Sequence, residues 1–434
     1  MRDLIIGLLI LAPMLMALRH PWIGALGWTW ISTMNPHAYS WRVSSMPVAA
    51  AMAGATFIGL LISSDKKRFF ITRETFVLML FMTWITITLP FSFYVDNSAE
   101  MWNRVIKIDF MILVTLIVIH SHKHLVAFVW VVAGSLAFYG VKGGLFTLAT
   151  GGSYRVWGPD NSYIAGNNEI ALALAMIIPL LWFLRGTLVK PWPRRAMVAA
   201  MALCAIASLG SQSRGALLAI GAMFTMFWFR GRHKLVTGVV LVVLSIAVLV
   251  FMPDSWTQRM GTIKTYDQDA SAMGRINAWH MAFNLAKSNL FGGGFEIYTQ
   301  KIFNMYAPDP TDVHAAHSIY FMVLGEQGFI GLFLFLLLWA LTWGSTRKMM
   351  REGRKQPETK WLADLGAMIQ ASFVGYFVGG AFLSLSYYDL PYNLMVMVIV
   401  GCKYLERKEW LNEPAPKVLP VADGPLAGAG AMKT

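Results

Sequence analysis

Charged residues are scarce in this chain of 434 residues. Asp, Glu, Lys and Arg make up 14% of it and hydrophobic residues 56%, whereas a soluble domain has roughly 25% charged residues. This shortage excludes an ordinary soluble protein, and the mean hydropathy of +0.54 agrees. Alternating strand patterns are also missing. The apolar runs are continuous and about 20 residues long, which is typical of helices that cross a bilayer rather than of barrel strands.

Cysteine is rare as well, and acidic residues are fewer than basic ones. Cys204 and Cys402 both lie inside apolar segments, so we expect neither a structural disulfide nor a cysteine metal site. The 36 basic and 23 acidic residues give a net charge of +13. Because most Lys and Arg residues lie in short loops between apolar runs, this charge indicates positive-inside membrane topology, and we expect no nucleic-acid binding.

The chain begins with two short apolar segments, residues 4–18 and 22–34, separated by Arg19-His20-Pro21. Each is shorter than a full crossing, so they form one broken span or a tight pair. No small-residue cleavage site follows the first, and we expect it to remain as an anchor. Further spans are expected at 47–63, 75–93, 105–119, 125–148, 169–184, 196–212, 215–229, 235–252, 316–343, 362–384 and 390–405. The sequence therefore predicts an all-α polytopic membrane protein with about 12 transmembrane helices.

The loops between these spans alternate in charge. If each run crosses once, the loops rich in Lys and Arg fall on one side, and the positive-inside rule assigns that side to the cytoplasm. Parity places the C-terminus there too, and also the N-terminus if residues 4–34 cross only once. The other side, periplasmic in a bacterial inner membrane, receives 35–46, 94–104, 149–168, 210–214, 253–315 and 385–390.

Four divisions of the chain follow from this pattern. Residues 1–252 are expected to form an N-terminal transmembrane bundle, and residues 253–315 one long helical periplasmic loop. Residues 316–410 are expected to form the C-terminal transmembrane helices. The remaining stretch, 411–434, is rich in Pro, Ala and Gly and is expected to be a disordered cytoplasmic tail.

Basic residues on the periplasmic side break the positive-inside pattern, and they are therefore candidate site residues. They are Arg214 at a boundary between two spans, Arg275 in the long loop, Arg155 and Lys142. Together they would suit a phosphate, although each could instead reach lipid headgroups. After Arg275, apolar residues recur at helical spacing and predict an amphipathic helix that could lie at the membrane interface; these are Ile276, Trp279, Phe283, Ala286 and Leu290.

His317, followed by Ser318, stands where the long loop enters the next span. A neutral imidazole is the natural general base near neutral pH, although a histidine hydrogen-bonded at a helix start would look the same. His314 lies one turn earlier, and Asp309 and Asp312 could add ligands for a metal. A full ligand set is not evident, so we expect no metal or other cofactor.

Two further features have ordinary structural readings. Glu169 stands at the head of a span, where a carboxylate complements the helix N-terminus, and it is kept as a secondary candidate. The three glycines at 292–294 lack the Lys-Ser/Thr of a phosphate-binding loop and do not follow a strand, so they predict a turn.

The stretch from His317-Ser318 to Gly328-x-x-Gly331 resembles the signature of the O-antigen ligase family, which shares its fold with O-antigen polymerases. That family has an arginine in a short periplasmic turn, another in a long periplasmic loop and a histidine near the loop's end. Arg214, Arg275 and His317 occupy these positions. The motifs Met34-Asn-Pro-His37, Phe138-Tyr-Gly-Val-Lys-Gly-Gly144 and Ser153-Tyr-Arg-Val-Trp-Gly-Pro159 are similar to the branch named for O-glycosylation in exosortase systems.

The resemblance implies a monomeric, GT-C-like glycosyltransferase among the membrane lipids. It would transfer O-antigen glycan from undecaprenyl diphosphate to a lipid A-core sugar at the periplasmic face. In that reading His317 is the general base and the two arginines bind the donor diphosphate. Three alternatives are an O-antigen polymerase, a transferase with a protein acceptor and, less favoured because the polar residues cluster at one face, a transporter.

Overall fold

The computed structural model describes residues 2–231, 238, 252–253, 256 and 270–413. Helices make up 76% of the structure, and the part of the chain that it describes contains no strand, so the all-α prediction is confirmed. Most of the expected span 235–252, part of the expected loop and residues 414–434 of the expected tail lie outside the described residues.

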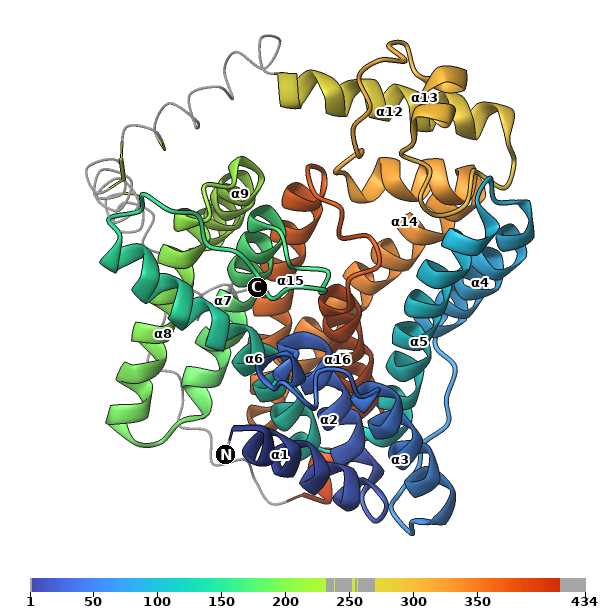
Figure 1. Ribbon diagram of the computed structural model, residues 1–434. Coiled ribbons are helices and arrows are strands. Elements are labelled where there is room, and N and C mark those ends of the chain that lie inside the picture. Colours follow the sequence, from blue (N-terminus) through green and yellow to red (C-terminus); the bar gives the residue numbers. More distant parts are fainter. Residues whose placement is uncertain (1, 232–237, 239–251, 254–255, 257–269, 414–434) are drawn as a thin grey trace, which may run out of the picture.

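Fourteen α-helices follow one another through the described ranges (Figure 1). They are α1 Arg2–Ala17, α2 Pro21–Met34, α3 Val48–Ile62, α4 Arg73–Thr88, α5 Val95–Val118, α6 His122–Ala149, α7 Asn167–Thr187, α8 Pro191–Gly210, α9 Arg214–Arg230, α12 Ala270–Ser288, α13 Gln300–Tyr306, α14 Ile319–Gly353, α15 Lys360–Gly380 and α16 Asp389–Glu406. Short 3₁₀ turns accompany them at η1 Pro36–Tyr39, η2 Leu89–Phe91, η4 Pro357–Thr359 and η5 Glu409–Leu411.

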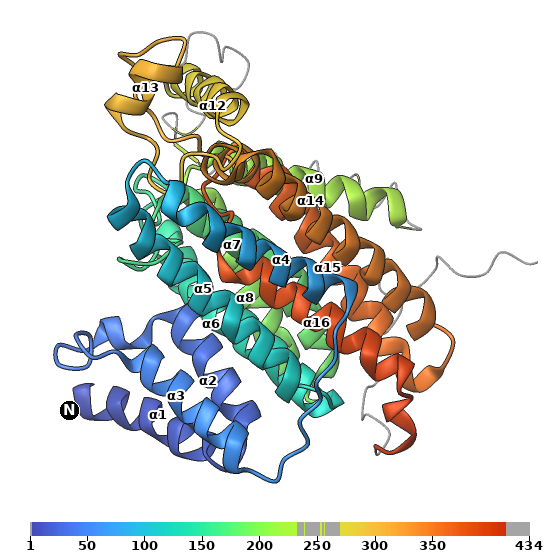
Figure 2. The same ribbon diagram turned by 90° about the vertical axis from the view of Figure 1, so that its right-hand side faces the viewer.

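Six helices in the described chain are long and apolar enough to cross a membrane. They are α4 with η2, α6, α7, α8, α14, and α15 with η4. The long helices run with a shared tilt from the upper left of Figure 2, near α12 and α13, to the lower right, where α16 ends. A helical membrane protein is therefore established, and the total of about 12 spans remains a prediction.

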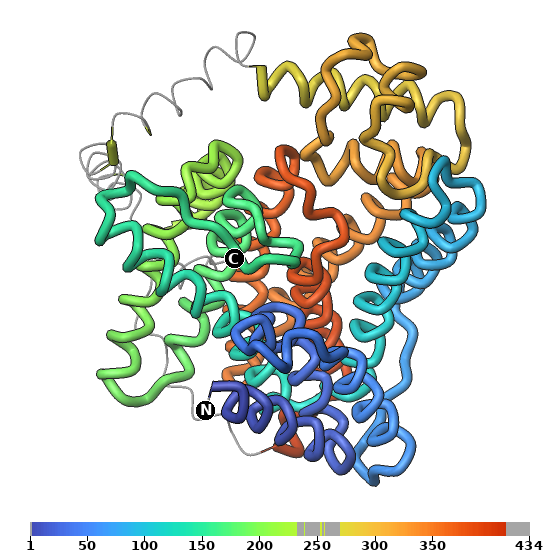
Figure 3. Tube along the Cα trace, viewed as in Figure 1, coloured from blue at the N-terminus to red at the C-terminus, as the bar shows by residue number. Residues whose placement is uncertain are grey.

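The first two helices form a pair rather than one broken span. Asp3, at the start of α1, accepts hydrogen bonds from Ser40 Oγ at 2.8 Å and Trp41 N at 3.1 Å. At the other end of the pair, His20 Nδ1 lies 3.0 Å from Asp65 Oδ2. The chain thus turns back between α1 and α2, and the start of α1 lies beside the 35–47 loop. The single crossing that would place the N-terminus with the basic loops is wrong. Figure 3 shows α1–α3 as a group away from α12 and α13.

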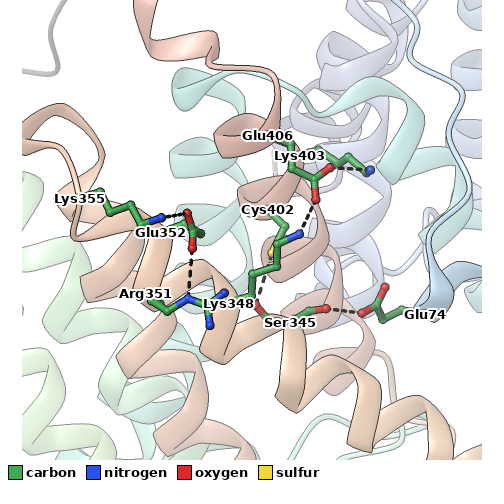
Figure 4. Close-up of polar contacts among 9 residues, drawn as sticks. All are labelled: Glu74, Ser345, Lys348, Arg351, Glu352, Lys355, Cys402, Lys403 and Glu406. Atoms are coloured by element: carbon green, nitrogen blue, oxygen red, sulfur yellow. Dashed lines mark hydrogen bonds and ion pairs between the residues drawn. The ribbon is translucent and has the colours of Figure 1, made fainter.

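The basic loops gather at one end of the bundle, which we term the basic end. Lys348 of α14 and Lys403 of α16 both contact Glu406, each at 2.8 Å (Figure 4). Arg68, in the loop before α4, pairs with Glu409 after α16. Loops that are far apart in sequence therefore meet at this end, as the alternating charge pattern predicts.

The opposite end, which we term the site end, carries the loops at 35–47, 89–94, 150–166, 211–213, 289–318 and 381–388. Hydrogen bonds hold the 289–318 loop to the segment around the start of α5: Phe93 N donates to Gly293 O at 2.9 Å, and Ser98 Oγ of α5 to Phe295 O at 3.0 Å. α12 and α13 form a cap over this end, at the top of Figure 1. The candidate residues therefore have to be sought here.

The helix expected after Arg275 is present as α12, and two of the five apolar residues in the expected pattern are exposed. Phe283 and Leu290 are 43% and 63% exposed. The helix packs onto the rest of the protein through another set of residues, which include Gly274, Asn277, Ala278, Met281 and Leu285. α12 lies so close to α14 that a Cβ on Gly325 would approach Ala282 Cβ to 3.0 Å. Small residues allow this close contact, and the exposed Phe283 is available to the membrane interface that the prediction names.

Candidate active site

Arg214 is the first residue of α9, at the turn that reverses the chain after α8. Gln212 occupies a left-handed conformation (φ 58°), and Ser213 Oγ caps the new helix by accepting from Ala216 N at 3.2 Å. Asn167 Nδ2 donates to Ser211 O at 2.8 Å and holds the turn against the start of α7. Arg214 is half-buried. A basic residue at the first position of α9 adds to the positive end of the helix dipole, which suits an anion.

Of the other two basic candidates, Arg155 and Lys142, one has hydrogen bonds that bring it toward this turn. Arg155 Nε donates to Gln212 Oε1 at 3.3 Å, and Gln212 Nε2 donates to Gly152 O at 3.3 Å. Lys142 instead lies with its Nζ 5.7 Å from the Tyr39 ring, on η1. The contacts therefore place Arg155, and not Lys142, beside the segment that leads into Arg214.

Arg275 and His317 lie close enough to interact electrostatically. Burial, the charge of Arg275 and then His314 lower the pKa of His317 from 6.5 to about 4. The Nδ1 atom of His317 lies 3.3 Å from Ser384 Oγ. His317 also has a left-handed backbone (φ 42°), which is uncommon for a residue with a side chain. The imidazole is therefore uncharged at neutral pH and is held by its Nδ1 side.

α12 fixes this relationship by clamping the segment that leads to His317. Asn277 Nδ2 donates to the backbone oxygens of Asp309 at 2.7 Å and Asp312 at 2.9 Å. Two residues on, Trp279 Nε1 donates to Ala316 O at 2.7 Å. Arg275 precedes both contacts on the same helix, so its distance from His317 depends on them.

Gly274 brings the imidazole of His314 against α12. A Cβ at this position would lie 2.5 Å from His314 Nδ1, and that approach is sterically forbidden. His314 Nδ1 lies 2.7 Å from Asp312 Oδ1, and Asp309 Oδ1 accepts from Thr311 N and Oγ1. Within the ranges that the structure describes, no group of three or more His, Cys, Asp or Glu residues has the geometry to hold a metal ion.

The two remaining candidates lie at helix starts. Glu169 folds back over the start of α7, where its Oε2 would lie 2.1 Å from a Cβ on Gly166. Arg275 acts electrostatically on this carboxylate as well as on His317, so Arg275 links the start of α7 to the start of α14. Ser318 is buried directly before α14, and its carbonyl accepts from Met322 N at 2.9 Å.

The loop after α15, residues 381–388, contacts several parts of the site, although no sequence motif marks it. A Cβ on Gly215, the residue after Arg214, would lie 3.3 Å from Phe382 Cβ. The Phe382 ring lies 6.5 Å from that of Trp279, and two residues later Ser384 contacts His317. Through this loop the start of α9, the clamp on α12 and the histidine share one support. The only sequence signal is a polar Ser-Leu-Ser between two apolar runs.

The three glycines at 292–294 form the predicted turn, and two of them hydrogen-bond to α14 where that helix is interrupted. Gly328 has φ 68° and ψ −173°, so the helix is interrupted there. The carbonyls of Gly325 and Glu326 accept instead from Gly293 N and Gly294 N, both at 2.9 Å. Trp84 Nε1 of α4 donates to the next carbonyl, Gln327 O, at 2.8 Å. The break thus binds the long loop to the helix that His317 precedes.

The fold and the site define a class: a helical membrane protein with a neutral histidine and arginines at one end of its bundle. Comparison with known families is more specific. Residues 196–336 match the family model described as O-antigen ligase, a region that includes Arg214, Arg275 and His317. The match supports a place in the O-antigen ligase and polymerase superfamily and a glycosyltransferase-like enzyme. Residues 1–188 match a family of unknown function, DUF5935. No curated protein matches the chain.

Proposed function

We propose that the protein transfers O-antigen glycan from undecaprenyl diphosphate to a hydroxyl of a lipid A-core sugar, at the periplasmic face of a bacterial inner membrane. The observation that carries the proposal is the placement of a neutral His317 within electrostatic reach of Arg275, in the region that matches the O-antigen ligase family. Outside the cytoplasm there is no supply of nucleotide sugars, so the energy has to come from an activated, lipid-linked donor.

The arginines would bind the leaving group. As the anomeric C–O bond breaks, negative charge develops on the donor diphosphate, and fixed guanidinium groups stabilise such charge. Arg275 is positioned by the α12 clamp, and Arg214 lies at the positive end of α9. Two arginines held by different helices could contact both phosphates, with Arg155 as a further cation at the rim.

His317 would accept the proton of the attacking hydroxyl. The contact between Nδ1 and Ser384 leaves Nε2 as the atom that can act as the base. The acceptor oxygen then bonds to the anomeric carbon as the bond to the diphosphate breaks, so this single displacement inverts the anomeric centre. A retaining route would need a carboxylate nucleophile. Glu326 is buried and its Oε2 accepts from Tyr387 OH at 2.8 Å, while Glu169 is folded onto its own helix start.

Donor binding would also adjust the base. A pKa of about 4 makes His317 a weak base in the unoccupied site. A diphosphate beside Arg275 would offset the guanidinium charge, and it would raise the pKa of His317 toward its ordinary 6.5. The histidine would then become a more effective base when the donor is in place.

Two related activities share this chemistry. An O-antigen polymerase uses a growing lipid-linked glycan as acceptor, and a protein O-oligosaccharyltransferase uses a protein hydroxyl. The donor contacts would be the same in all three, so only the product separates them: capped lipid A-core, a lengthened lipid-linked glycan or a glycoprotein. A transporter for lipid-linked sugar is disfavoured, because the candidate residues gather at one end of the bundle rather than mid-span.

Reconstitution tests the proposal directly. Purified protein in liposomes is given undecaprenyl-diphosphate-linked glycan and lipid A-core, without nucleotide sugar. The wild type should form capped lipid A-core with inverted anomeric configuration. His317→Ala should lose about 100-fold or more in rate, the usual contribution of a general base, and should still bind donor. His280→Ala, an exposed histidine on α12, is the control. Full activity of His317→Ala, or a retained configuration, would contradict the mechanism.

A further inference from the structure

A cavity of about 210 Å³ lies at the basic end, far from the candidate active site and inside the region matched by the family of unknown function. It is formed by the start of α2, the loop before α4 and the turn between α5 and α6. Its lining residues are Pro21, Trp22, Asp65, Lys66, Lys67, Val118, His120 and His124. We refer to it as the lysine pocket.

The lysine pocket is positively charged. Lys66 and Lys67 line it, and Lys123 lies beside it with its Nζ 5.7 Å from the centre of the Trp22 ring. Asp65 is the one acidic lining residue, and His20 lies 3.0 Å from its carboxylate. Lys67 Nζ donates to the Ser63 backbone at 2.7 Å, a contact that does not neutralise its charge. The balance of charge therefore favours an anionic ligand.

One wall of the pocket is formed by packed aromatic rings. The rings of Trp22 and His124 stack with their centroids 4.3 Å apart and an interplanar angle of 16°. His120 packs edge-on against His124, with its centroid at 4.9 Å. Burial and the charge of Arg68 lower the pKa of His120, and its Nδ1 donates to Val118 O at 3.1 Å, so this neutral imidazole packs against the pocket and has no second N–H for a ligand. The two ammonium groups of Lys66 and Lys67 are therefore the donors that suit phosphate oxygens.

Exposed apolar side chains flank the lysine pocket in the sequence. Leu61 and Ile62 precede its lysines and are 76% and 68% exposed, and Phe69 and Ile71 follow them at 76% and 72%. An amphiphilic ligand fits this combination, with its charged head in the pocket and its chains along the apolar side chains. A free phosphate would use only the pocket.

We propose that the lysine pocket binds the phosphate headgroup of an anionic phospholipid, with Lys66 and Lys67 as the principal contacts. The basic end is the cytoplasmic end if the chain follows the positive-inside rule, and basic pockets between transmembrane helices on that side suit anionic headgroups. The lipid would fasten the α1–α3 group to the rest of the bundle, because the pocket joins α2 to the α5–α6 turn. The proposal does not depend on glycan transfer at the site end.

Native mass spectrometry of the purified full chain tests this binding. Phosphatidylglycerol or phosphatidylcholine is added in detergent, and the bound lipid is counted. The wild type should retain phosphatidylglycerol in preference to phosphatidylcholine. K66Q/K67Q should bind it about 10- to 30-fold more weakly, since each lysine near an anionic headgroup contributes about one fivefold factor, and K66R/K67R should retain it. R194Q/R195Q is the matched control, because it also removes two positive charges, from a different part of the chain. In both variants one of the two substituted residues is exposed and the other is half-buried.

The outcomes separate the possible ligands. A loss of phosphatidylglycerol binding in K66Q/K67Q, but not in R194Q/R195Q, supports the phospholipid assignment. If inorganic phosphate displaces phosphatidylglycerol from the wild type at equal concentration, the pocket takes the phosphate of a soluble compound, and the lipid assignment is overturned. An equal loss of phosphatidylglycerol binding in R194Q/R195Q would mean that the lipid is attracted to basic surfaces in general, and the assignment to this pocket would be overturned. Unchanged phosphatidylglycerol binding in K66Q/K67Q, at a wild-type melting temperature, would overturn it as well.

Discussion

His317 combines three properties that rarely occur together by chance. Its backbone is left-handed (φ 42°), its Nδ1 is held by Ser384 and its pKa is lowered to about 4. Backbone conformations of this kind cost about 1–3 kcal/mol and persist where surrounding contacts impose them. Here the Trp279 bond to Ala316 and the burial of Ser318 supply those contacts on either side of the histidine. The position is built around one orientation of the imidazole.

The lowered pKa predicts the pH dependence of transfer. A lowered pKa keeps the imidazole neutral, and so able to act as a base, at every pH above it. In the unoccupied enzyme that limit is about pH 4, so kcat/KM should stay level from pH 8 down to about pH 5. In the donor complex the pKa is expected to be higher, and kcat should begin to fall at a higher pH than kcat/KM does.

Initial rates of the reconstituted enzyme between pH 4.5 and 8, at limiting and saturating donor, measure both profiles. Arg275→Gln removes one cause of the lowered pKa, and it should shift the fall of kcat/KM to higher pH as well as weakening donor binding. Arg42→Gln, an exposed arginine of the 35–47 loop, is the control. An acid limb of kcat/KM near 6.5 in the wild type would show that the environment of His317 is not the one described.

At the scale of elements, the break in α14 decides how the long loop meets the bundle. A continuous helix would bond the carbonyls of Gly325, Glu326 and Gln327 internally. The break at Gly328 leaves these three carbonyls without helical partners, and they accept hydrogen bonds from the glycine turn and from Trp84 instead. A buried carbonyl without a partner would cost about 1–3 kcal/mol, so the turn and the break stabilise each other. His317 stands at the head of this same helix.

Gly328→Ala is therefore expected to destabilise the protein and to impair transfer. The φ/ψ values of Gly328 are accessible essentially to glycine alone, and a Cβ there would lie 2.4 Å from Leu290 O. The expected loss is about 1–3 kcal/mol from strain, and more from the clash. The melting temperature in detergent and the transfer rate measure it.

Gly344→Ala is the matched control for this change. It lies in the same helix, and a Cβ there meets nothing within 4 Å, so the substitution should be neutral or raise stability by up to about 1 kcal/mol. If both variants melt at the same temperature, the break in α14 does not carry the stability assigned to it.

Most helices could be predicted because hydropathy alone marks a span. The expected runs 125–148 and 169–184 correspond to α6 and α7 to within three residues. The role of Ser384 could not be predicted. It depends on where the loop after α15 folds back. That is set by packing between distant segments, which periodicity does not record.

At the scale of the whole molecule, the two ends of the bundle differ in chemistry. The basic end gathers lysines, arginines and the lysine pocket, while the site end gathers the long loop, α12 and the candidate histidine. The pairing of α1 with α2 brings Asp3 to Ser40 and therefore to the site end. A short apolar run at the start of a chain can thus be half of a hairpin, and only the contact between its ends distinguishes this from a single crossing.

The positive-inside rule predicts that the basic end faces the cytoplasm and the site end the periplasm, and cysteine labelling can test this orientation. Tyr154→Cys and Trp41→Cys replace residues at the site end that are 66% and 83% exposed. Lys355→Cys replaces an exposed residue of the basic end whose ion pair with Glu352 contributes little. The native Cys204 and Cys402 are buried and should react slowly.

A membrane-impermeant maleimide added to cells with a permeable outer membrane should label positions 154 and 41 directly. It should label position 355 only after the inner membrane is opened. This result would place the donor diphosphate site outside the cytoplasm, where a lipid-linked glycan is the available donor, and would place α1 and α2 as a returning pair. Labelling of position 355 but not 154 in intact cells would reverse the orientation and remove the basis for glycan transfer at the periplasmic face. Labelling at 154 without 41 would instead contradict the placement of the 35–47 loop beside the site end.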